Sequence, residues 1–236
     1  MANEKNDRLA VLIDADNAQA SLAAELLAEI AQYGRATVKR AYGDWTTPNL
    51  RAWKEILHKH AIQPIQQFAY TAGKNATDSS LIIDAMDLLH SRSFDGFCLV
   101  SSDSDFTPLA TRLKESGAAV YGFGERKTPD PFVSACDKFT FTEILRPQLE
   151  RGIVVEGGES VELKDLLRKA IDETSKDDGW SNLGEVGGRL SKLQPSFDSR
   201  NYGFSKLSNL VRAESYVEVK TGANGDGPGT VYVRLR

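Results

Sequence analysis

The sequence predicts an α/β fold, a parallel sheet covered by helices on both faces, followed by a small C-terminal winged-helix domain. Two observations support this. Over the first 145 residues, short apolar runs alternate with segments of helical period, which is the pattern of a parallel sheet wrapped by helices. After about residue 160, three amphipathic helical segments precede two alternating strands, which is the outline of a winged helix.

The first region contains five predicted strands with helices between them. Arg8–Asp14 is a dense apolar run ending in a carboxylate, as expected of a strand buried on both faces. The other strands are predicted at Ala36–Tyr42, Ile62–Phe68, Gly96–Val100 and Ala118–Phe123. The helices are predicted at Ser21–Tyr33, Pro48–His60, Thr77–His90 and Phe106–Glu115.

The pattern breaks after residue 145, where Pro147 and Gly157-Gly158 are typical of an interdomain connection. We therefore expect one domain over residues 1–145, a linker over 146–159 and a second domain over 160–236. In the second domain, helices are predicted at Leu163–Ile171, Leu183–Leu193 and Asn201–Glu214, and strands at Tyr216–Lys220 and Thr230–Leu235.

The net charge of −4 is not the basic balance typical of a nucleic-acid-binding protein. The acidity lies in one region, because residues 1–145 hold 15 Lys and Arg against 19 Asp and Glu, whereas residues 160–236 hold 12 against 11. Cys98 and Cys136 have neither metal-ligand spacing nor a disulfide pattern, and Cys98 is expected to be a buried thiol. Without a signal-peptide core or a membrane-length apolar run, we expect a cytoplasmic protein with no membrane contact.

Aspartates gather where the predicted sheet should bind ligands, outside the carboxyl ends of its strands. Asp14 ends the first strand, Asp103 and Asp105 follow the fourth, and Asp78 opens the helix that precedes the fourth. Crowded carboxylates repel one another, so such a cluster is expected where a cation compensates it. Mg²⁺ and Mn²⁺ prefer oxygen ligands, and a pair of such ions can support phosphodiester cleavage.

Two other interpretations use the same residues. Asp103 or Asp105 could simply cap the helix that follows, and Asp78 could favour the start of its own helix. Asp14-Ala15-Asp16 is also similar to the nucleophile motif of haloacid-dehalogenase-like phosphatases. Ala18 stands where that motif has Thr or Val, and no clear catalytic lysine segment or cap domain follows.

Longer segments carry a more specific resemblance. VLIDADN, KNATDSSLIIDAMDLL and LVSSDSDFTPLATRLKESGAAVYGFG resemble the NYN domain, the PIN-like nuclease domain of the LabA/DUF88 group. The segment from Leu163 to Val211, with its DGW and YGFSKL strings, is similar to the OST-HTH/LOTUS module. The resemblance implies a PIN-like ribonuclease fold dependent on Mg²⁺ or Mn²⁺, with a module that binds single-stranded or structured RNA.

The resemblance also implies roles for individual residues. Asp14, Asp78, Asp103 and Asp105 match the acidic positions that bind metal, and Asn17 matches an Asn expected to orient water or phosphate. Asp84 matches a recurring Asp, but six residues past Asp78 it points in another direction on an ideal helix. Asp84 and Ser101 are therefore candidates for supporting the metal-binding residues. Ser102 stands where many members have Gly.

In the second domain, polar residues around the second and third predicted helices are the candidates for binding nucleic acid. Asn201, Tyr202 and Lys206 would lie in the first turns of the third helix, the usual reading position of helix-turn-helix proteins. Cations nearby could contact phosphates without reading sequence. The full candidate set is Lys192, Arg200, Asn201, Tyr202, Lys206 and Arg212. Trp180, Phe197 and Phe204 are expected in the core.

Two functions therefore follow from the sequence. One is a metal-dependent ribonuclease acting at the aspartate cluster, with RNA held by the second domain. The other is a non-catalytic regulator that binds RNA or protein and whose acidic pocket is silent. A homodimer is compatible with either.

Overall fold

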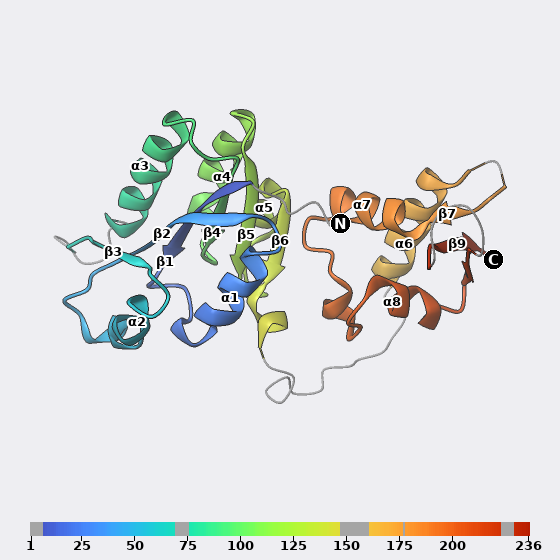
Figure 1. Ribbon diagram of the computed structural model, residues 1–236, viewed down its shortest axis with the longest axis horizontal. Helices are drawn as coiled ribbons and strands as arrows, with labels where there is room; N and C mark the ends of the chain where they lie inside the picture. The colour runs from blue at the N-terminus through green and yellow to red at the C-terminus, as the bar shows by residue number, and fades with distance from the viewer. Residues whose placement is uncertain (1–6, 69–75, 147–160, 177, 223–228) are drawn as a thin grey trace. The chain divides into compact units, whose positions relative to one another are not determined.

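The chain forms two compact units, residues 1–151 and 152–236, in a computed structural model (Figure 1). The structure describes residues 7–68, 76–146, 161–176, 178–222 and 229–236. Apart from Arg146, the predicted linker at 146–159 lies outside the described residues.

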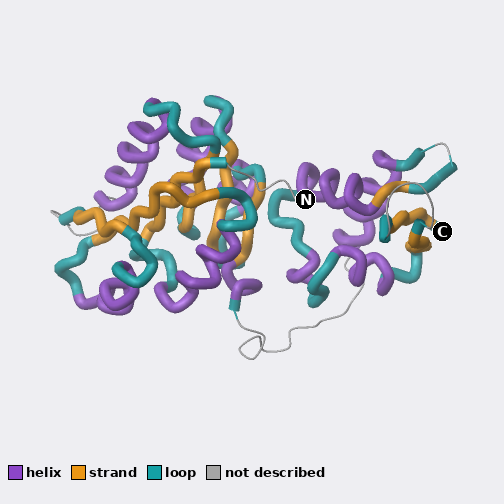
Figure 2. The backbone as a smooth tube through the Cα atoms, in the orientation of Figure 1, coloured by secondary structure: helices purple, strands orange, loops and turns teal. Residues whose placement is uncertain are grey.

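The first unit is built on a six-stranded sheet in which all neighbouring strands are parallel, in the order β3-β2-β1-β4-β5-β6. Its strands are drawn in orange, with helices around them in purple, in Figure 2. The chain moves outward from β1 to β3, returns to β4 beside β1, and then moves outward in the other direction. Strand order thus reverses between β1 and β4, and ligands of open α/β sheets bind outside the strand ends at such a point. The strands are β1 (Arg8–Asp14), β2 (Arg35–Gly43), β3 (Gln63–Gln66), β4 (Gly96–Val100), β5 (Ala119–Gly124) and β6 (Lys138–Phe141).

Both faces of this sheet are covered, because successive side chains of a strand point to opposite sides. On one face, Leu9, Val11 and Ile13 of β1 pack with α1 (Ala23–Ile30) and α2 (Arg51–Leu57). On the other face, Ala10 and Leu12 pack with α3 (Ala76–His90), α4 (Thr107–Glu115) and α5 (Asp130–Ala135). The predicted α/β fold with helices on both faces is confirmed.

The last part of this unit differs from the sequence-based expectation. Helix α5 and strand β6 were not predicted, and they add a sixth strand at the edge of the sheet. Six and four residues long, they are too short to show a period, and Pro129 and Pro131 around the helix start read as loop residues. The bounds of β1 and β4, by contrast, agree with the prediction.

The second unit packs three helices on a small antiparallel sheet, as the winged-helix prediction expects. Its core includes Leu167, Val186, Leu190, Leu210 and Val233, none of which is exposed. The strand order is β7-β9-β8. The elements are α6 (Val161–Thr174), β7 (Ser181–Asn182), α7 (Leu183–Leu193), α8 (Leu207–Ala213), β8 (Val217–Thr221) and β9 (Val231–Leu235).

The third predicted helix of this unit is divided in two. A short 3-10 helix, η5 (Ser199–Tyr202), ends at Gly203, whose φ of 85° lies in the left-handed region that glycine adopts without strain. Helix α8 begins four residues later, after Lys206 as its N-cap residue. Asn201 and Tyr202 therefore lie in η5, and the expectation that they occupy the first turns of the third helix was wrong.

Two smaller expectations concern the cysteines and membranes. Cys98 and Cys136 are free and buried, and burial raises the pKa of the Cys136 thiol to about 12. Within the described part of the chain, no helix has the length and apolar character needed to cross a bilayer.

Candidate metal centre

The functional residues gather at the carboxyl ends of β1 and β4, where strand order reverses. Ile13 pairs with Val100, the last residue of β4, so Asp14 and Ser101 lie side by side just beyond the pair. A short 3-10 helix, η3 (Ser104–Phe106), follows β4 and leads into α4. Helix α3 packs beside β1 and presents Asp78 in its first turn. Three separate segments of the chain therefore meet at this edge.

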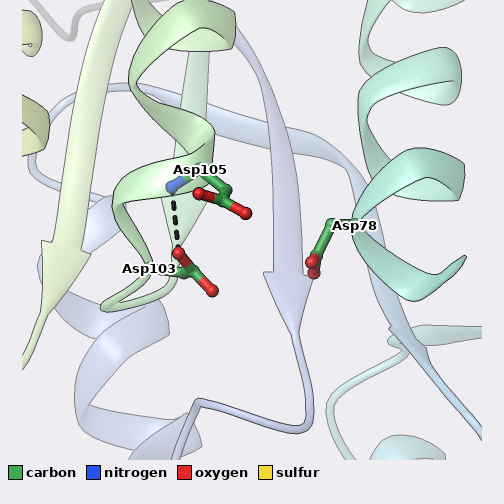
Figure 3. A group of neighbouring side chains, drawn as sticks. All are labelled: Asp78, Asp103 and Asp105. Carbon is green, nitrogen blue, oxygen red and sulfur yellow. Dashed lines mark hydrogen bonds between the residues drawn. The ribbon is translucent and has the colours of Figure 1, made fainter. Parts of the chain in front are cut away.

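Asp78, Asp103 and Asp105 form a group of three carboxylates (Figure 3). One oxygen from each lies within 4.8 Å of the other two. The turn after β4 fixes two of them, since the Asp103 side chain caps η3 by accepting a hydrogen bond of 2.9 Å from the Asp105 amide. The capping role considered for Asp103 therefore exists, and it holds the side chain within the group instead of diverting it.

Asp14 is the most buried of the four acids and lies beside the group of three. Its carboxyl group is 1% exposed, and Oδ2 accepts hydrogen bonds of 2.7 Å from Asn17 Nδ2 and from Ser101 Oγ. The other oxygen, Oδ1, is buried and has no hydrogen-bond donor among the described residues. Burial raises the pKa of Asp14 above its ordinary value despite these hydrogen bonds, because a buried charge loses its hydration.

Ser101 connects Asp14 to the turn that carries Asp103. Its hydroxyl donates to Asp14 Oδ2 and accepts a hydrogen bond of 3.1 Å from the Asp103 amide. Ser101 is itself 3% exposed, so water does not compete for these bonds. One hydroxyl therefore positions a strand carboxylate and a turn carboxylate with respect to each other.

Asp78 shows how strongly negative this edge is. Its pKa is raised to about 6, first by burial and then by the charges of Asp14, Asp103, Asp105 and Asp16. No described Lys or Arg forms an ion pair with Asp14, Asp78 or Asp103. The edge thus holds negative charge that these residues do not balance.

Asp16 also belongs to this edge, although the sequence did not mark it as a site residue. It accepts a hydrogen bond of 3.4 Å from Thr77 Oγ1, at the start of α3, next to Asp78. Its pKa is raised by burial and by the nearby Asp44 carboxylate. Its position two residues past Asp14 in the IDADN string was the signal that could have identified it.

Asn17 and Ser101 also line a pocket. Its apolar lining includes Leu22, Leu26 and Phe123, and Gln19 Nε2 donates a hydrogen bond of 2.7 Å to Glu125 Oε1 in its lining. The grouped carboxylates do not line this pocket, so it borders the acidic edge without forming part of it. The acidic edge is the part of the sheet edge that carries Asp14, Asp16, Asp78, Asp103 and Asp105.

The comparisons with known proteins agree with this geometry. Residues 8–145, more than half of the chain, match the family model of the NYN domain. The chain belongs to the NYN family. Residues 159–228 match the family model of the OST-HTH/LOTUS domain, so the resemblance drawn from the sequence is confirmed. NYN domains are nuclease-like, related PIN-like nucleases typically use divalent metals, and OST-HTH domains bind RNA.

Similar solved structures add to the comparison without assigning a function. A protein of unknown function from Vibrio parahaemolyticus is 20% identical, covers 59% of this chain and 94% of its own, and has a TM-score of 0.48. An uncharacterized protein from Nitrosomonas europaea is 32% identical over 39% of this chain and 85% of its own, with a TM-score of 0.31. A protein from Chromobacterium violaceum is 37% identical over 33% and 84%, with a TM-score of 0.28. No curated relative matches the chain.

The remaining candidates of the NYN domain have partners of their own. Asp84 accepts short hydrogen bonds from Arg40 and from the hydroxyl of buried Tyr42. It thus joins α3 to β2 and lies outside the group of three carboxylates. Ser102, which stands where many NYN members have Gly, accepts a hydrogen bond of 2.8 Å from the Glu125 amide. The Ser102 side chain thereby ties the turn after β4 to the end of β5.

In the OST-HTH domain the six candidate residues divide into two groups. Arg200 forms hydrogen bonds of 3.0 and 2.7 Å to the two carboxylate oxygens of Asp198, Asn201 Nδ2 donates to the Ser196 carbonyl, and the Tyr202 ring lies 6.0 Å from that of Phe197. These three have structural partners. Three cations are exposed on or beside α7 and α8: Lys192, Lys206 and Arg212.

The aromatic residues of this domain divide in a way that the sequence did not predict. Phe197 is in the core and Phe204 packs against it, as expected. Trp180 lies outside the core formed by the described residues, and the expectation that it packs inside was wrong. It is half-buried, close to the side chains of Lys220 and Arg234.

Proposed function

We propose that this NYN protein is a ribonuclease that cleaves phosphodiester bonds with Mg²⁺ or Mn²⁺ held at the acidic edge, while its OST-HTH domain holds the RNA. The observation that carries the proposal is the group of three carboxylates within 4.8 Å, beside buried Asp14, at the point of strand reversal. In a nuclease-like domain this is where ligands of the sheet are expected. A homodimer and a cytoplasmic location stay predictions, and the comparisons do not support a dimer.

The side chains fit a hard divalent cation. Among the described residues Asp14 Oδ1 is buried without a donor, and a buried oxygen in that state costs free energy until something binds it. Burial, and after it the charges of the neighbouring aspartates, raise the pKa of Asp78, and a bound cation would offset both effects. Asp78, Asp103 and Asp105 would hold the ion, with Asp14 beside them. A bound ion would supply Lewis acidity and positive charge for hydrolysis of a phosphodiester.

The residues around the acids would keep them in place during turnover. Asn17 and Ser101 fix one oxygen of Asp14 and leave the other oxygen available. The Asp105 amide and the Ser101 hydroxyl fix the turn that carries Asp103. The pKa of Asp78 is about 6 in the metal-free protein, so Asp78 is largely protonated below pH 6 and cation binding there should release a proton.

Cleavage assays test the proposal. Labelled single-stranded RNA, duplex RNA and DNA are incubated with wild type and with Asp14→Asn and Asp103→Asn, in Mg²⁺, Mn²⁺ or EDTA. We expect wild type to cleave RNA only with a metal, and each variant to lose activity by on the order of 100-fold or more. Asp87→Asn is a matched control, because Asp87 is an exposed acid farther along α3; it should cleave as wild type does.

Metal binding is measured separately by Mn²⁺ titration, so that a folded but inactive protein is recognised. Wild type should bind Mn²⁺, whereas Asp103→Asn should bind it at least about 10-fold more weakly. RNA binding by a wild type that cleaves nothing under any metal would favour the alternative, a regulator with a silent acidic pocket. Equal cleavage by wild type and by both variants would place the reaction elsewhere.

A further inference from the structure

The outward face of the small sheet in the OST-HTH domain carries aromatic and cationic side chains. Val217, Ser181 and Val233 point into the domain and are buried. Since side chains alternate along a strand, Tyr232 and Arg234 of β9 and Lys220 of β8 point outward. Trp180, directly before β7, joins them on that side, as its contacts with both cations show. Together Trp180, Lys220, Tyr232 and Arg234 form what we name the wing face.

Contacts between cations and rings connect these four side chains. The Lys220 ammonium lies 4.0 Å from the centre of the Trp180 ring and 5.6 Å from that of Tyr232. The Arg234 guanidinium carbon lies 4.7 Å from the Trp180 ring centre. Attraction between a cation and a ring face holds such an arrangement together. Two rings and two cations are thus presented as one surface.

The charges of the wing face are only partly balanced inside the domain. Arg234 forms an ion pair of 2.6 Å with Glu218, the neighbouring residue across the strands. Lys220 is exposed and forms no ion pair with a described residue. The face therefore offers positive charge next to flat apolar rings, which complements a ligand with phosphates and planar bases.

We propose that the wing face binds single-stranded RNA. One base takes the place of Lys220 or Arg234 over the Trp180 ring, another stacks on Tyr232, and the two cations contact phosphates. The proposal rests on the RNA-holding role proposed above for this domain and assigns that role to a surface. Aromatic rings beside cations bind unpaired strands with little sequence preference, because every base has a flat face. Paired bases are already stacked in a duplex and cannot use the rings in this way.

The wing face is favoured for a physical reason over the surface of α7 and α8, which we call the helical surface. Among the candidates around η5, Arg200, Asn201 and Tyr202 hold their own fold together. Lys192, Lys206 and Arg212 remain as exposed cations, which offer phosphates charge alone. Stacking adds a contribution that salt does not screen, and within the described part of this domain the wing face combines it with two cations.

Binding to the full-length protein in EDTA tests the proposal, because cleavage is then prevented. Fluorescence anisotropy is measured with a labelled single-stranded RNA and with a hairpin duplex of the same composition. Wild type should prefer the single strand. Trp180→Ala should weaken its binding by about 5- to 100-fold, whereas Trp180→Phe, which keeps a ring, should lose much less. In the Trp180 turn, the Trp180 amide donates to Asp178 Oδ1 and its carbonyl accepts from the Lys176 amide, and neither bond involves the replaced side chain.

The cations are compared in a matched pair. Lys220→Gln removes the wing-face ammonium and Lys192→Gln removes one exposed ammonium from α7. Lys220→Gln should weaken binding more than Lys192→Gln and lower the slope of log affinity against log salt by about 0.7. If Lys192→Gln weakens binding and neither Lys220→Gln nor Trp180→Ala does, the helical surface binds the RNA and the proposal is overturned. Equal binding of duplex and single strand also overturns it.

Tryptophan emission gives a readout that a purely structural role would not change. Of the three tryptophans, Trp53 is buried and Trp45 is partly buried in the NYN domain, and both are still present in Trp180→Phe. If a base stacks on Trp180, RNA should quench the emission of wild type more than that of Trp180→Phe. Failure of the proposed ribonuclease activity can be distinguished from failure of the wing-face proposal, because wing-face variants can lose RNA binding even if wild type never cleaves RNA. A wild type that binds no RNA overturns both the RNA-holding role and the wing face.

Discussion

The carboxylates at the acidic edge of the NYN domain and those of the OST-HTH domain differ in whether they form ion pairs with arginine. In the OST-HTH domain, Asp198, Glu173 and Glu218 each pair with an arginine two to sixteen residues away. At the acidic edge, Asp14, Asp78 and Asp103 form no ion pair with any described residue. Carboxylates that a chain balances itself support its structure, whereas carboxylates at a strand reversal that pair with no described cation are available to a cation from solution.

The largest effect is expected from a substitution that places a positively charged side chain at the acidic edge. Asp105→Lys places an ammonium beside Asp78 and Asp103, so it should compete with a divalent ion for their oxygens. Cleavage should fall by on the order of 100-fold or more, while the metal-free protein should become more stable to heat. The two measurements are RNA cleavage and thermal melting in EDTA. Retained activity in this variant would show that the edge needs no added cation.

A smaller loss is expected from Ser101→Ala, which removes the hydroxyl between Asp14 and the Asp103 amide. The carboxylates stay, but their mutual positions are no longer fixed, so cleavage and Mn²⁺ affinity should fall by about 10- to 100-fold. Ser101→Thr keeps the hydroxyl and is the matched variant, expected to retain more activity. An unchanged Mn²⁺ affinity in Ser101→Ala would mean that the acids are positioned without it.

For an ion pair of the OST-HTH domain we expect a loss of stability and only a small loss of RNA affinity. Arg200→Gln removes the hydrogen bonds to half-buried Asp198 and should lower the free energy of unfolding of that domain by about 2 kcal/mol. RNA affinity of the protein that remains folded should change less than it does in Trp180→Ala. Thermal melting and anisotropy below the melting range check this. A loss of affinity without a loss of stability would make Arg200 a phosphate contact.

The smallest effect concerns the stability of the metal-free protein against pH. The pKa of Asp78 is about 6 in the folded protein and 3.8 for an isolated carboxyl, so folding favours its protonated form. Its ionised form therefore lowers stability as pH rises from 3.8 towards 6, and the full cost is present above 6. Because Asp78 is partly exposed, Asp78→Asn should stabilise the metal-free protein at pH 7 by only about 1 kcal/mol. The gain should vanish near pH 4, and thermal melting of wild type and Asp78→Asn in EDTA across this pH range measures it.

The sequence predicted the elements whose local pattern is strong. β1 and β4 are dense apolar runs, and their ends placed Asp14 and Asp103 at one edge. The sequence could not say which oxygens would lie within 4.8 Å, because that depends on how α3 packs beside β1. It predicted that Asp84 would point away from Asp78. It could not predict the partners of Asp84, because Arg40 and Tyr42 lie on a strand more than forty residues earlier in the chain.

The errors have a common physical origin in short elements. The break between η5 and α8 comes from the left-handed Gly203, which a helical period of apolar residues does not reveal. β7 has two residues, too few for any alternation, yet it places Trp180 at the edge of the outward sheet face. The residue type of Trp180 alone therefore predicts a core position, whereas the side chains it contacts lie on β8 and β9.

The hydroxyl of Ser101 gives the centre a built-in reporter. It accepts from the backbone amide of Asp103 while donating to Asp14, so the electronic state of that amide depends on the charge of Asp14 through a single intervening oxygen. The nitrogen chemical shift of Asp103 should therefore follow protonation of Asp14, or capture of a cation beside it, without any substitution in the protein. Occupancy of the centre becomes observable at one resonance, in the resting protein and before any bond in the RNA is broken.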